Sequence, residues 1–118
     1  MRRPVVHFEI GCNSLAQTSA FYKNIFGWDT SPNGENALTI DTGSEDSITG
    51  HFTQLTPKDP QRFINIYIET DSLEEDLKAI KANGGEVMVP PITLPDGRMF
   101  AWFKDIAGNT VGLITPGN

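Results

Sequence analysis

The sequence predicts an α+β fold made of two tandem βαβββ modules, and three observations support this prediction. The chain has 118 residues, the length of one ordinary domain. The segments that begin at His7 and Asn65 lie 58 positions apart and repeat an alternating strand, a capping residue, Ser-Leu at a helix start and a closing glycine. A polar stretch with two prolines separates the copies. We expect one domain over residues 1–118, with a first module at 4–55, a linker at 56–61 and a second module at 62–116.

The first module begins with residues 6–10, which alternate between apolar and polar side chains as in a strand with one buried face. Asn13 or Ser14 then caps a helix, and Gly27 supplies the left-handed residue that ends it. Phe21, Tyr22 and Phe26 recur at helical spacing and are expected in the core, as is Trp28 at the start of the next strand. Three strands are expected to follow: residues 28–30, 37–41 and 47–55.

The second module repeats this order. Residues 62–70 predict a strand, Asp71 or Ser72 begins an amphipathic helix, and the Asn-Gly-Gly of residues 83–85 ends it. Three further strands are expected: residues 86–89, 98–104 and 110–115. Residues 90–97 contain three prolines and are expected to form a long, stiff loop.

Composition excludes several classes of partner. The chain carries 9 basic and 15 acidic residues, a net charge of −6 that repels nucleic acid and anionic lipid. With 38 % hydrophobic residues it can form a core, and no apolar run reaches the roughly 18 residues of a membrane span. Cys12 is the single cysteine, so no intramolecular disulfide forms. We expect a cytoplasmic protein that binds neither nucleic acid nor membranes.

Two sequence motifs add to the repeated βαβββ pattern. The first helix ends in Phe21-Tyr22-x-x-Ile25-Phe26-Gly27-Trp28, and Asp105-x-x-Gly108-Asn109-x-x-x-Leu113 lies near the C-terminus. Together they resemble the vicinal oxygen chelate (VOC) superfamily of glyoxalase I, bleomycin resistance proteins and extradiol dioxygenases, and the resemblance covers essentially the whole chain. It implies curled mixed sheets around a shared cleft that holds a ligand or metal, helices on the other face, and a homodimer.

Under this resemblance, the first strand of each module has one face toward a helix and the other toward the cleft. The even positions are expected to pack on the helices: Val6, Phe8, Ile10, Ile64, Ile66 and Ile68. The odd positions and one neighbouring strand are expected to line the cleft and bind the ligand: His7, Glu9, His51, Asn65, Tyr67, Glu69 and Trp102. The polar side chains of this set suit a cleft better than a sealed core, where each would need a partner. The alternative is a sheet face turned to solvent.

The resemblance also implies a test for a metal site. Metal-using members place two histidines and two carboxylates on the first and last strands of the modules, ligands that suit a divalent ion. His7 matches the first position, but Asn65 is a poor ligand and Gly112 has no side chain. The fourth position is His51 or Gln54, because no motif fixes the register there. The expected cofactor is therefore none, or a divalent ion held by His7 and His51.

Candidate catalytic groups are few. Glu9 and Glu69 form a general acid-base pair if their strands meet across the cleft. Cys12 lies beside a helix start that would lower its pKa, and the alternative is a packed, inert thiol. We expect a protein that binds a small polar or cationic organic molecule in the cleft between the modules, without a complete metal site. The alternatives are a divalent-metal lyase or isomerase of the glyoxalase I type, a dioxygenase-like enzyme, and an accessory domain without a ligand; whether the chain is an enzyme stays open.

Overall fold

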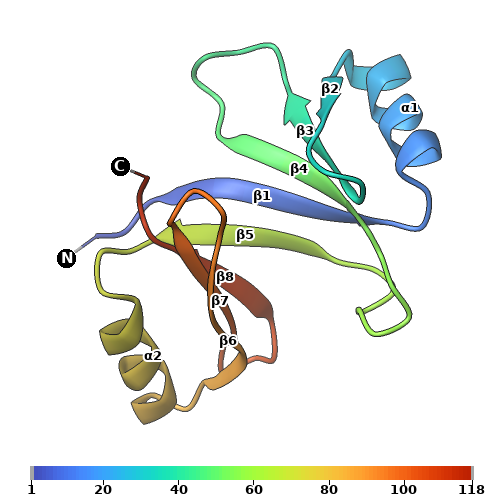
Figure 1. Cartoon of the computed structure of the whole chain (residues 1–118). Coiled ribbons are helices and arrows are strands. Elements are labelled where there is room, and N and C mark those ends of the chain that lie inside the picture. Colours follow the sequence, from blue (N-terminus) through green and yellow to red (C-terminus); the bar gives the residue numbers. More distant parts are fainter. Residues whose placement is uncertain (1, 118) are drawn as a thin grey trace. The chain divides into compact units, whose positions relative to one another are not determined.

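Two consecutive βαβββ runs make up the chain in a computed structural model that describes residues 2–117 (Figure 1). The first run comprises β1 (Val5–Cys12), α1 (Leu15–Phe26), β2 (Asp29–Pro32), β3 (Ala37–Asp41) and β4 (Thr49–Gln54). The second run comprises β5 (Ile64–Glu69), α2 (Leu73–Ala82), β6 (Glu86–Thr93), β7 (Met99–Lys104) and β8 (Thr110–Ile114). The predicted α+β class is confirmed. Neither helix in residues 2–117 has the length and apolarity required to cross a membrane.

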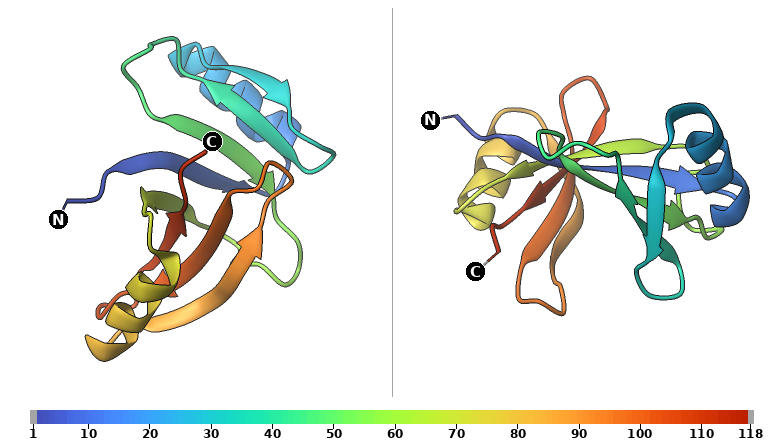
Figure 2. Two further views of the ribbon diagram at one scale, coloured as in Figure 1. Left: turned by 60° about the vertical axis from the view of Figure 1, so that its left-hand side comes forward. Right: turned by 90° about the horizontal axis from the view of Figure 1, so that it is seen from above.

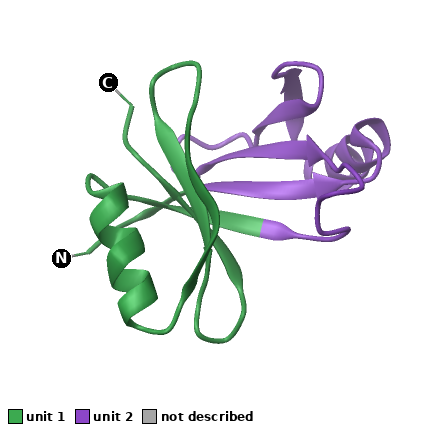
Figure 3. Cartoon of the chain, turned by 60° about the horizontal axis from the view of Figure 1, so that its bottom comes forward, with its two compact units in different colours: residues 1–6, 65–118 green, residues 7–64 purple. Residues whose placement is uncertain are grey.

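The chain divides into two compact units (Figure 3). The His7 unit contains residues 7–64, and the Asn65 unit contains residues 65–118 together with residues 1–6. The start of β1 therefore belongs to the Asn65 unit, although most of the strand lies in the His7 unit. Each unit has its own helix and its own buried cluster.

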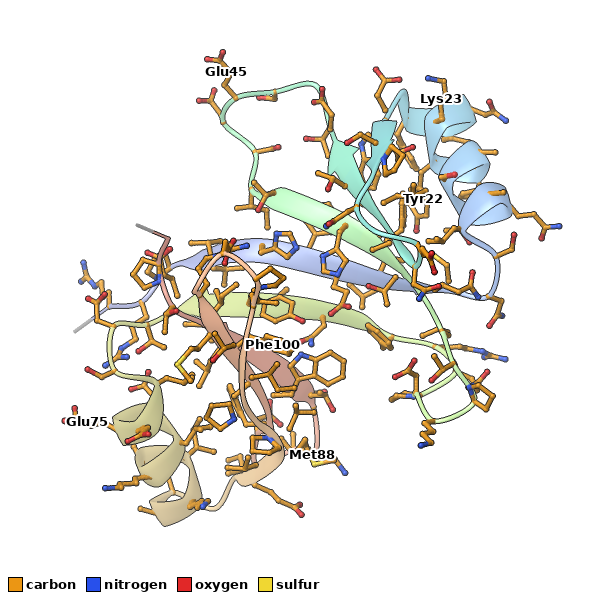
Figure 4. All side chains as sticks on the ribbon, in the orientation of Figure 1. Tyr22, Lys23, Glu45, Glu75, Met88 and Phe100 are labelled. Carbon is orange, nitrogen blue, oxygen red and sulfur yellow. The ribbon has the colours of Figure 1, made fainter. Side chains whose placement is uncertain are left out.

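The sheet of the His7 unit has the strand order β2-β3-β4-β1, in which β1 and β4 run parallel and the other pairs are antiparallel. Helix α1 lies on one side of it (Figure 2). The buried residues on that side are Ile10, Cys12, Ile40 and Phe52. Tyr22 of α1 points toward these strands and stacks on Trp28 with ring centroids 5.0 Å apart, whereas Lys23 points outward (Figure 4).

The ends of α1 follow the sequence prediction. Ser14 is the N-cap, and its hydroxyl accepts a hydrogen bond from the Gln17 amide at 3.2 Å. Gly27 adopts a left-handed φ of 74° and its N–H donates to the Lys23 carbonyl, which closes the helix.

The expected burial of two aromatic residues in α1 is wrong. Phe21 and Phe26 are 56 % and 60 % exposed, and α1 has no buried residue. Tyr22 and Trp28 both contact Phe52 and so occupy the space above the sheet. Phe26 therefore lies at the edge of this cluster, with its ring centroid 6.0 Å from that of Tyr22 and 6.1 Å from that of Trp28.

The sheet of the Asn65 unit has the order β5-β8-β7-β6, again with one parallel pair, β5 and β8. Its buried cluster consists of Leu73, Leu77, Ala101 and Leu113. Arg3 contacts the Thr70 hydroxyl and forms an ion pair with Asp76, which ties the N-terminal segment to α2. Asn83 is the C-cap of α2, and Gly84 follows with φ 94°.

Two further expectations for this unit are wrong. Strand β6 continues through Pro90 and Pro91 to Thr93 instead of giving way to a loop at residue 90. Because β6 is the edge strand and its register with β7 shifts on both sides of Val89, the prolines need not donate ladder hydrogen bonds. Ile64 and Ile66 are 69 % and 40 % exposed rather than packed, since α2 lies against β6 and β7 and leaves the start of β5 uncovered.

Candidate functional site

Five polar side chains form a continuous row on the β1–β4 pair of the His7 unit. The parallel register sets His7 opposite Thr49 and Glu9 opposite His51. Since side chains alternate along a strand, these residues and Thr53 share the face opposite Phe52 and Ile10 of the core. We call this set the polar row: Thr49, His7, His51, Glu9 and Thr53.

Hydrogen bonds join every neighbour in the polar row. His7 Nδ1 lies 2.6 Å from the Thr49 hydroxyl, and His7 Nε2 lies 2.6 Å from His51 Nδ1. His51 Nε2 is 3.1 Å from Glu9 Oε2, and the Thr53 hydroxyl donates to the same oxygen at 2.7 Å. The two imidazoles are stacked with centroids 4.9 Å apart.

Burial increases along the polar row from Thr49 to Glu9. Thr49 is exposed, the His51 side chain is 21 % exposed, and the Glu9 side chain is only 7 % exposed. A buried carboxylate is costly unless it is hydrogen-bonded, and His51 and Thr53 supply bonds to Glu9. The row thus has a buried acidic end and an end that reaches solvent.

With Glu9 ionised and both imidazoles neutral, the donors and acceptors of the polar row follow one direction. An ionised Glu9 only accepts hydrogen bonds, so His51 Nε2 carries the proton in their contact. In a neutral His51, Nδ1 is then an acceptor, so His7 Nε2 donates to it. A neutral His7 consequently accepts a hydrogen bond at Nδ1 from the Thr49 hydroxyl.

The structure brings His51 to His7 and assigns Gln54 another role. The Gln54 side chain donates to the Asn13 carbonyl at 2.8 Å and accepts from the Leu15 amide at 3.3 Å, so it holds the start of α1. Sequence reasoning missed Thr49 and Thr53. Their alternation with His51 along β4 was the available signal, since positions two apart share a face.

The predicted ligand contacts of the Asn65 unit have different surroundings. The Trp102 indole donates to the Tyr67 hydroxyl at 2.9 Å. Asn65 is 2 % exposed, and within residues 2–117 neither polar atom of its side chain has a hydrogen-bond partner. Glu69 lines a pocket of about 120 Å³ with Arg2 and the start of α2. Glu69 and Glu9 lie in different units.

The residues present do not fit a resident divalent ion in this arrangement. Among the described residues, no group of three or more His, Cys, Asp or Glu is placed to hold a metal. Two nitrogens bound to one tetrahedral zinc lie about 3.3 Å apart and face the ion, whereas His7 Nε2 and His51 Nδ1 face each other at 2.6 Å. A Cβ at Gly112 would lie 2.3 Å from the Tyr67 ring, so a carboxylate has no room there.

Cys12 has the surroundings of a packed thiol. It is 1 % exposed and its Sγ contacts the Ile10 carbonyl at 3.6 Å. Burial raises the pKa of the Cys12 thiol, and hydrogen bonds involving Thr18 and Thr53 only partly oppose this shift. A raised pKa leaves little reactive thiolate at neutral pH.

The repeated βαβββ fold agrees with a sequence comparison. The family model described as Glyoxalase/Bleomycin resistance protein/Dioxygenase superfamily matches residues 5–113. The chain belongs to this superfamily. A search of the curated proteins finds no match for it.

Solved structures of the superfamily fold cover nearly all of this chain. A hypothetical protein from Bacillus halodurans C-125 superposes with a TM-score of 0.77 at 15 % identity, covering 100 % of this chain and 97 % of that one. Methylmalonyl-CoA epimerase from Mycobacterium tuberculosis gives 0.73 at 10 % identity, with 97 % and 88 % covered. A variant of the Streptomyces coelicolor methylmalonyl-CoA epimerase, in complex with 2-nitronate-propionyl-CoA, gives 0.62 at 20 % identity, with 97 % of each chain covered. At these identities the similarity shows the fold.

Proposed function

We propose that this superfamily member binds a small organic molecule at the polar row of the His7 unit and does so without a resident metal. The observation that carries the proposal is the continuous hydrogen-bonded row from Thr49 to Glu9. Only its inner end is buried, and such a row of oriented groups on an accessible sheet face is suited to fixing a polar ligand.

The polarity of the row defines the class of molecule. At its outer end, the Thr49 hydroxyl donates its proton to His7 Nδ1 in the assigned direction, and its oxygen has lone pairs that can accept hydrogen bonds. A ligand that brings a donor, such as a hydroxyl, amide or ammonium group, would complement them. The net charge of −6 favours polar neutral or cationic ligands over anionic ones.

The fold neighbours support a small-molecule ligand. The Streptomyces coelicolor epimerase variant holds 2-nitronate-propionyl-CoA within the same fold. Ligand contacts are proposed in each unit by itself: His7, Glu9 and His51 in the His7 unit, and Asn65, Tyr67, Glu69 and Trp102 in the Asn65 unit. The buried Asn65 amide, which has no partner among the described residues, is a group that a ligand would satisfy.

A thermal-shift screen of polar and cationic small molecules tests this proposal. A ligand present at about 100 times its Kd stabilises the protein by about 2.7 kcal/mol. The stabilisation should disappear in His7→Gln and persist in Lys23→Ala, which alters an exposed helix position away from the polar row. If every ligand found stabilises His7→Gln as well as the unmodified chain, the polar row is not the site, and an accessory domain without a ligand there becomes the better description.

A divalent-metal lyase or isomerase, or a dioxygenase-like enzyme, is the second candidate, because His7 and His51 lie next to each other and would have to turn their nitrogens toward an ion to hold it. Metal analysis of protein purified without a histidine tag separates the two. A stoichiometric divalent ion that is lost in His7→Ala would replace the metal-free proposal. The proposal also includes a homodimer and a cytoplasmic location, which light scattering and a fluorescent fusion would test.

A further inference from the structure

We infer that Asn33 is a site of spontaneous covalent modification, at which the chain converts its own side-chain amide to aspartate and isoaspartate. Asn33 and Gly34 lie in the turn that joins β2 to β3 in the His7 unit (Figure 1). This turn lies outside the polar row, so the inference does not depend on the proposed function.

The reaction needs only water. The backbone nitrogen of Gly34 loses its proton and attacks the side-chain carbonyl carbon of Asn33. A new C–N bond closes a cyclic imide, and the side-chain nitrogen leaves as ammonia with that proton. Water then opens either carbonyl bond of the imide, which gives aspartate or isoaspartate at position 33. Atoms balance without an enzyme or an oxidant, because a water molecule replaces the ammonia.

Both reacting groups of this turn are accessible and free to move. Asn33 and Gly34 are exposed. Within residues 2–117, neither the Asn33 side chain nor the Gly34 N–H has a hydrogen-bond partner; the turn is closed by the Asn33 N–H, which donates to the Ala37 carbonyl at 3.0 Å. Gly34 has no Cβ to hinder the attack, and a Cβ added there would meet no atom within 4 Å. The side-chain carbon and the backbone nitrogen can therefore approach each other.

The second Asn-Gly pair of the chain, Asn83-Gly84, is held in place. Asn83 is the C-cap of α2, and its side-chain nitrogen donates to the Ala79 carbonyl at 2.7 Å. The Gly84 N–H, which would be the attacking nitrogen, donates to the Lys81 carbonyl at 3.3 Å. The reaction at Asn83 must first break both bonds, so the same two-residue sequence should react at different rates in the two units.

The modified chain should remain folded. All four residues of β2 are exposed, and β2 is the edge strand of its sheet, so little packing depends on the turn. Isoaspartate carries the backbone through the former side chain and lengthens the β2–β3 connection by a methylene group. Both products also add a negative charge to the net −6 of the chain. We therefore expect folded protein to become more acidic as it ages.

Peptide mass spectrometry of protein incubated at mildly alkaline pH is the first test. It follows the exchange of ammonia for water at each Asn-Gly pair, and methylation by a purified isoaspartyl methyltransferase counts the isoaspartate. In folded protein we expect Asn33 to convert at least about tenfold faster than Asn83, because the hydrogen bonds at Asn83 add to its barrier. In urea-unfolded protein the two rates should converge. Conversion of Asn83 as fast as Asn33 in folded protein overturns the inference, as does a difference of the same size in urea.

Variants of the turn are the second test. Gly34→Ala should slow the conversion of Asn33 at least about tenfold, because a Cβ hinders the approach of the two groups. Asn33→Gln should yield no product at this position over the same period, because the longer side chain closes a larger ring. The matched control is Glu45→Gln, an exposed carboxylate in the β3–β4 loop of the same unit, which should keep the full rate (Figure 4). An unchanged rate in Gly34→Ala overturns the inference.

Discussion

The two units share one architecture but use the same strand positions differently. In the His7 unit, the face of β1 and β4 opposite the core carries a hydrogen-bonded row that contains two imidazoles and a carboxylate. In the Asn65 unit, the corresponding strands β5 and β8 carry Asn65, Tyr67 and Gly112, with the Tyr67 ring lying against the glycine. A βαβββ module thus supports either a titratable site or aromatic packing on the same scaffold.

The largest expected effect tests whether each unit depends on its own core. Phe52 is fully buried in the His7 unit and Leu113 is 3 % exposed in the Asn65 unit. We expect Phe52→Ala to cost about 3–5 kcal/mol and Leu113→Ala about 2–5 kcal/mol in urea unfolding. Phe21→Ala, at a residue 56 % exposed, is the control and should change stability by less than about 0.5 kcal/mol. A comparable loss in Phe21→Ala would contradict the open face described for α1.

The next test compares an aromatic-glycine pair in each unit. A Cβ at Gly50 would lie 2.2 Å from the Phe8 ring, and one at Gly112 would lie 2.3 Å from the Tyr67 ring. Each Gly→Ala variant should lose about 1–3 kcal/mol in urea unfolding. Combining Gly112→Ala with Tyr67→Leu should cost less than the sum of the single changes, because the smaller side chain leaves room. Strict additivity would mean that the ring does not impose the glycine.

Glu9 and Asn65 differ more sharply, since both are buried and polar, but Glu9 is hydrogen-bonded to His51 and Thr53 whereas the Asn65 amide has no partner among residues 2–117. Glu9→Leu should destabilise by about 1–3 kcal/mol, because it leaves His51 and Thr53 without their acceptor. Asn65→Leu should be neutral or stabilising by about 1 kcal/mol, because it removes a buried amide that lacks a partner. Ligand-free protein is compared by thermal unfolding. A large loss in Asn65→Leu would show that the amide is bonded in solution.

The smallest expected effect concerns the exposed turn before β8. The Asn109 side chain and amide donate to Asp105, and these bonds hold the pKa of its carboxyl below the ordinary value. A carboxyl whose pKa is lower in the folded state stabilises the protein above its unfolded pKa, and the contribution is lost as the pH falls through the folded pKa. The Asp105→Asn variant should therefore have a lower Tm than the unmodified protein at neutral pH, and this difference should vanish in acid. A deficit that stays constant with pH would rule out the charge as its cause.

Local sequence signals predicted most of the fold. The alternation around His7, the Ser14 cap and the left-handed Gly27 are short-range features, and the structure places the strand, the helix start and the helix end accordingly. The same signals could not show that α2 leaves Ile64 uncovered or that Pro90 is tolerated at a sheet edge. Both outcomes depend on which elements meet after folding.

The candidate site was predictable only in part, for the same reason. His7 and Glu9 follow from alternation along one strand, but the contact of His7 with His51 joins residues 44 positions apart. It depends on the parallel register of β1 and β4, which no motif in the sequence fixes. Thr49 and Thr53 become recognisable as members of the polar row only when that register is known.

The full burial of Phe52 constrains the register of β4 and therefore the positions of the polar-row side chains. A slip of β4 by one residue would turn Phe52 out of the core and send His51 and both threonines into it. Such a slip forfeits several kcal/mol of apolar burial, so misaligned pairings are sparsely populated. Although Phe52 lies on the opposite face of the sheet, its burial therefore stabilises the one register of β1 and β4 in which the imidazoles and the carboxylate of the polar row meet.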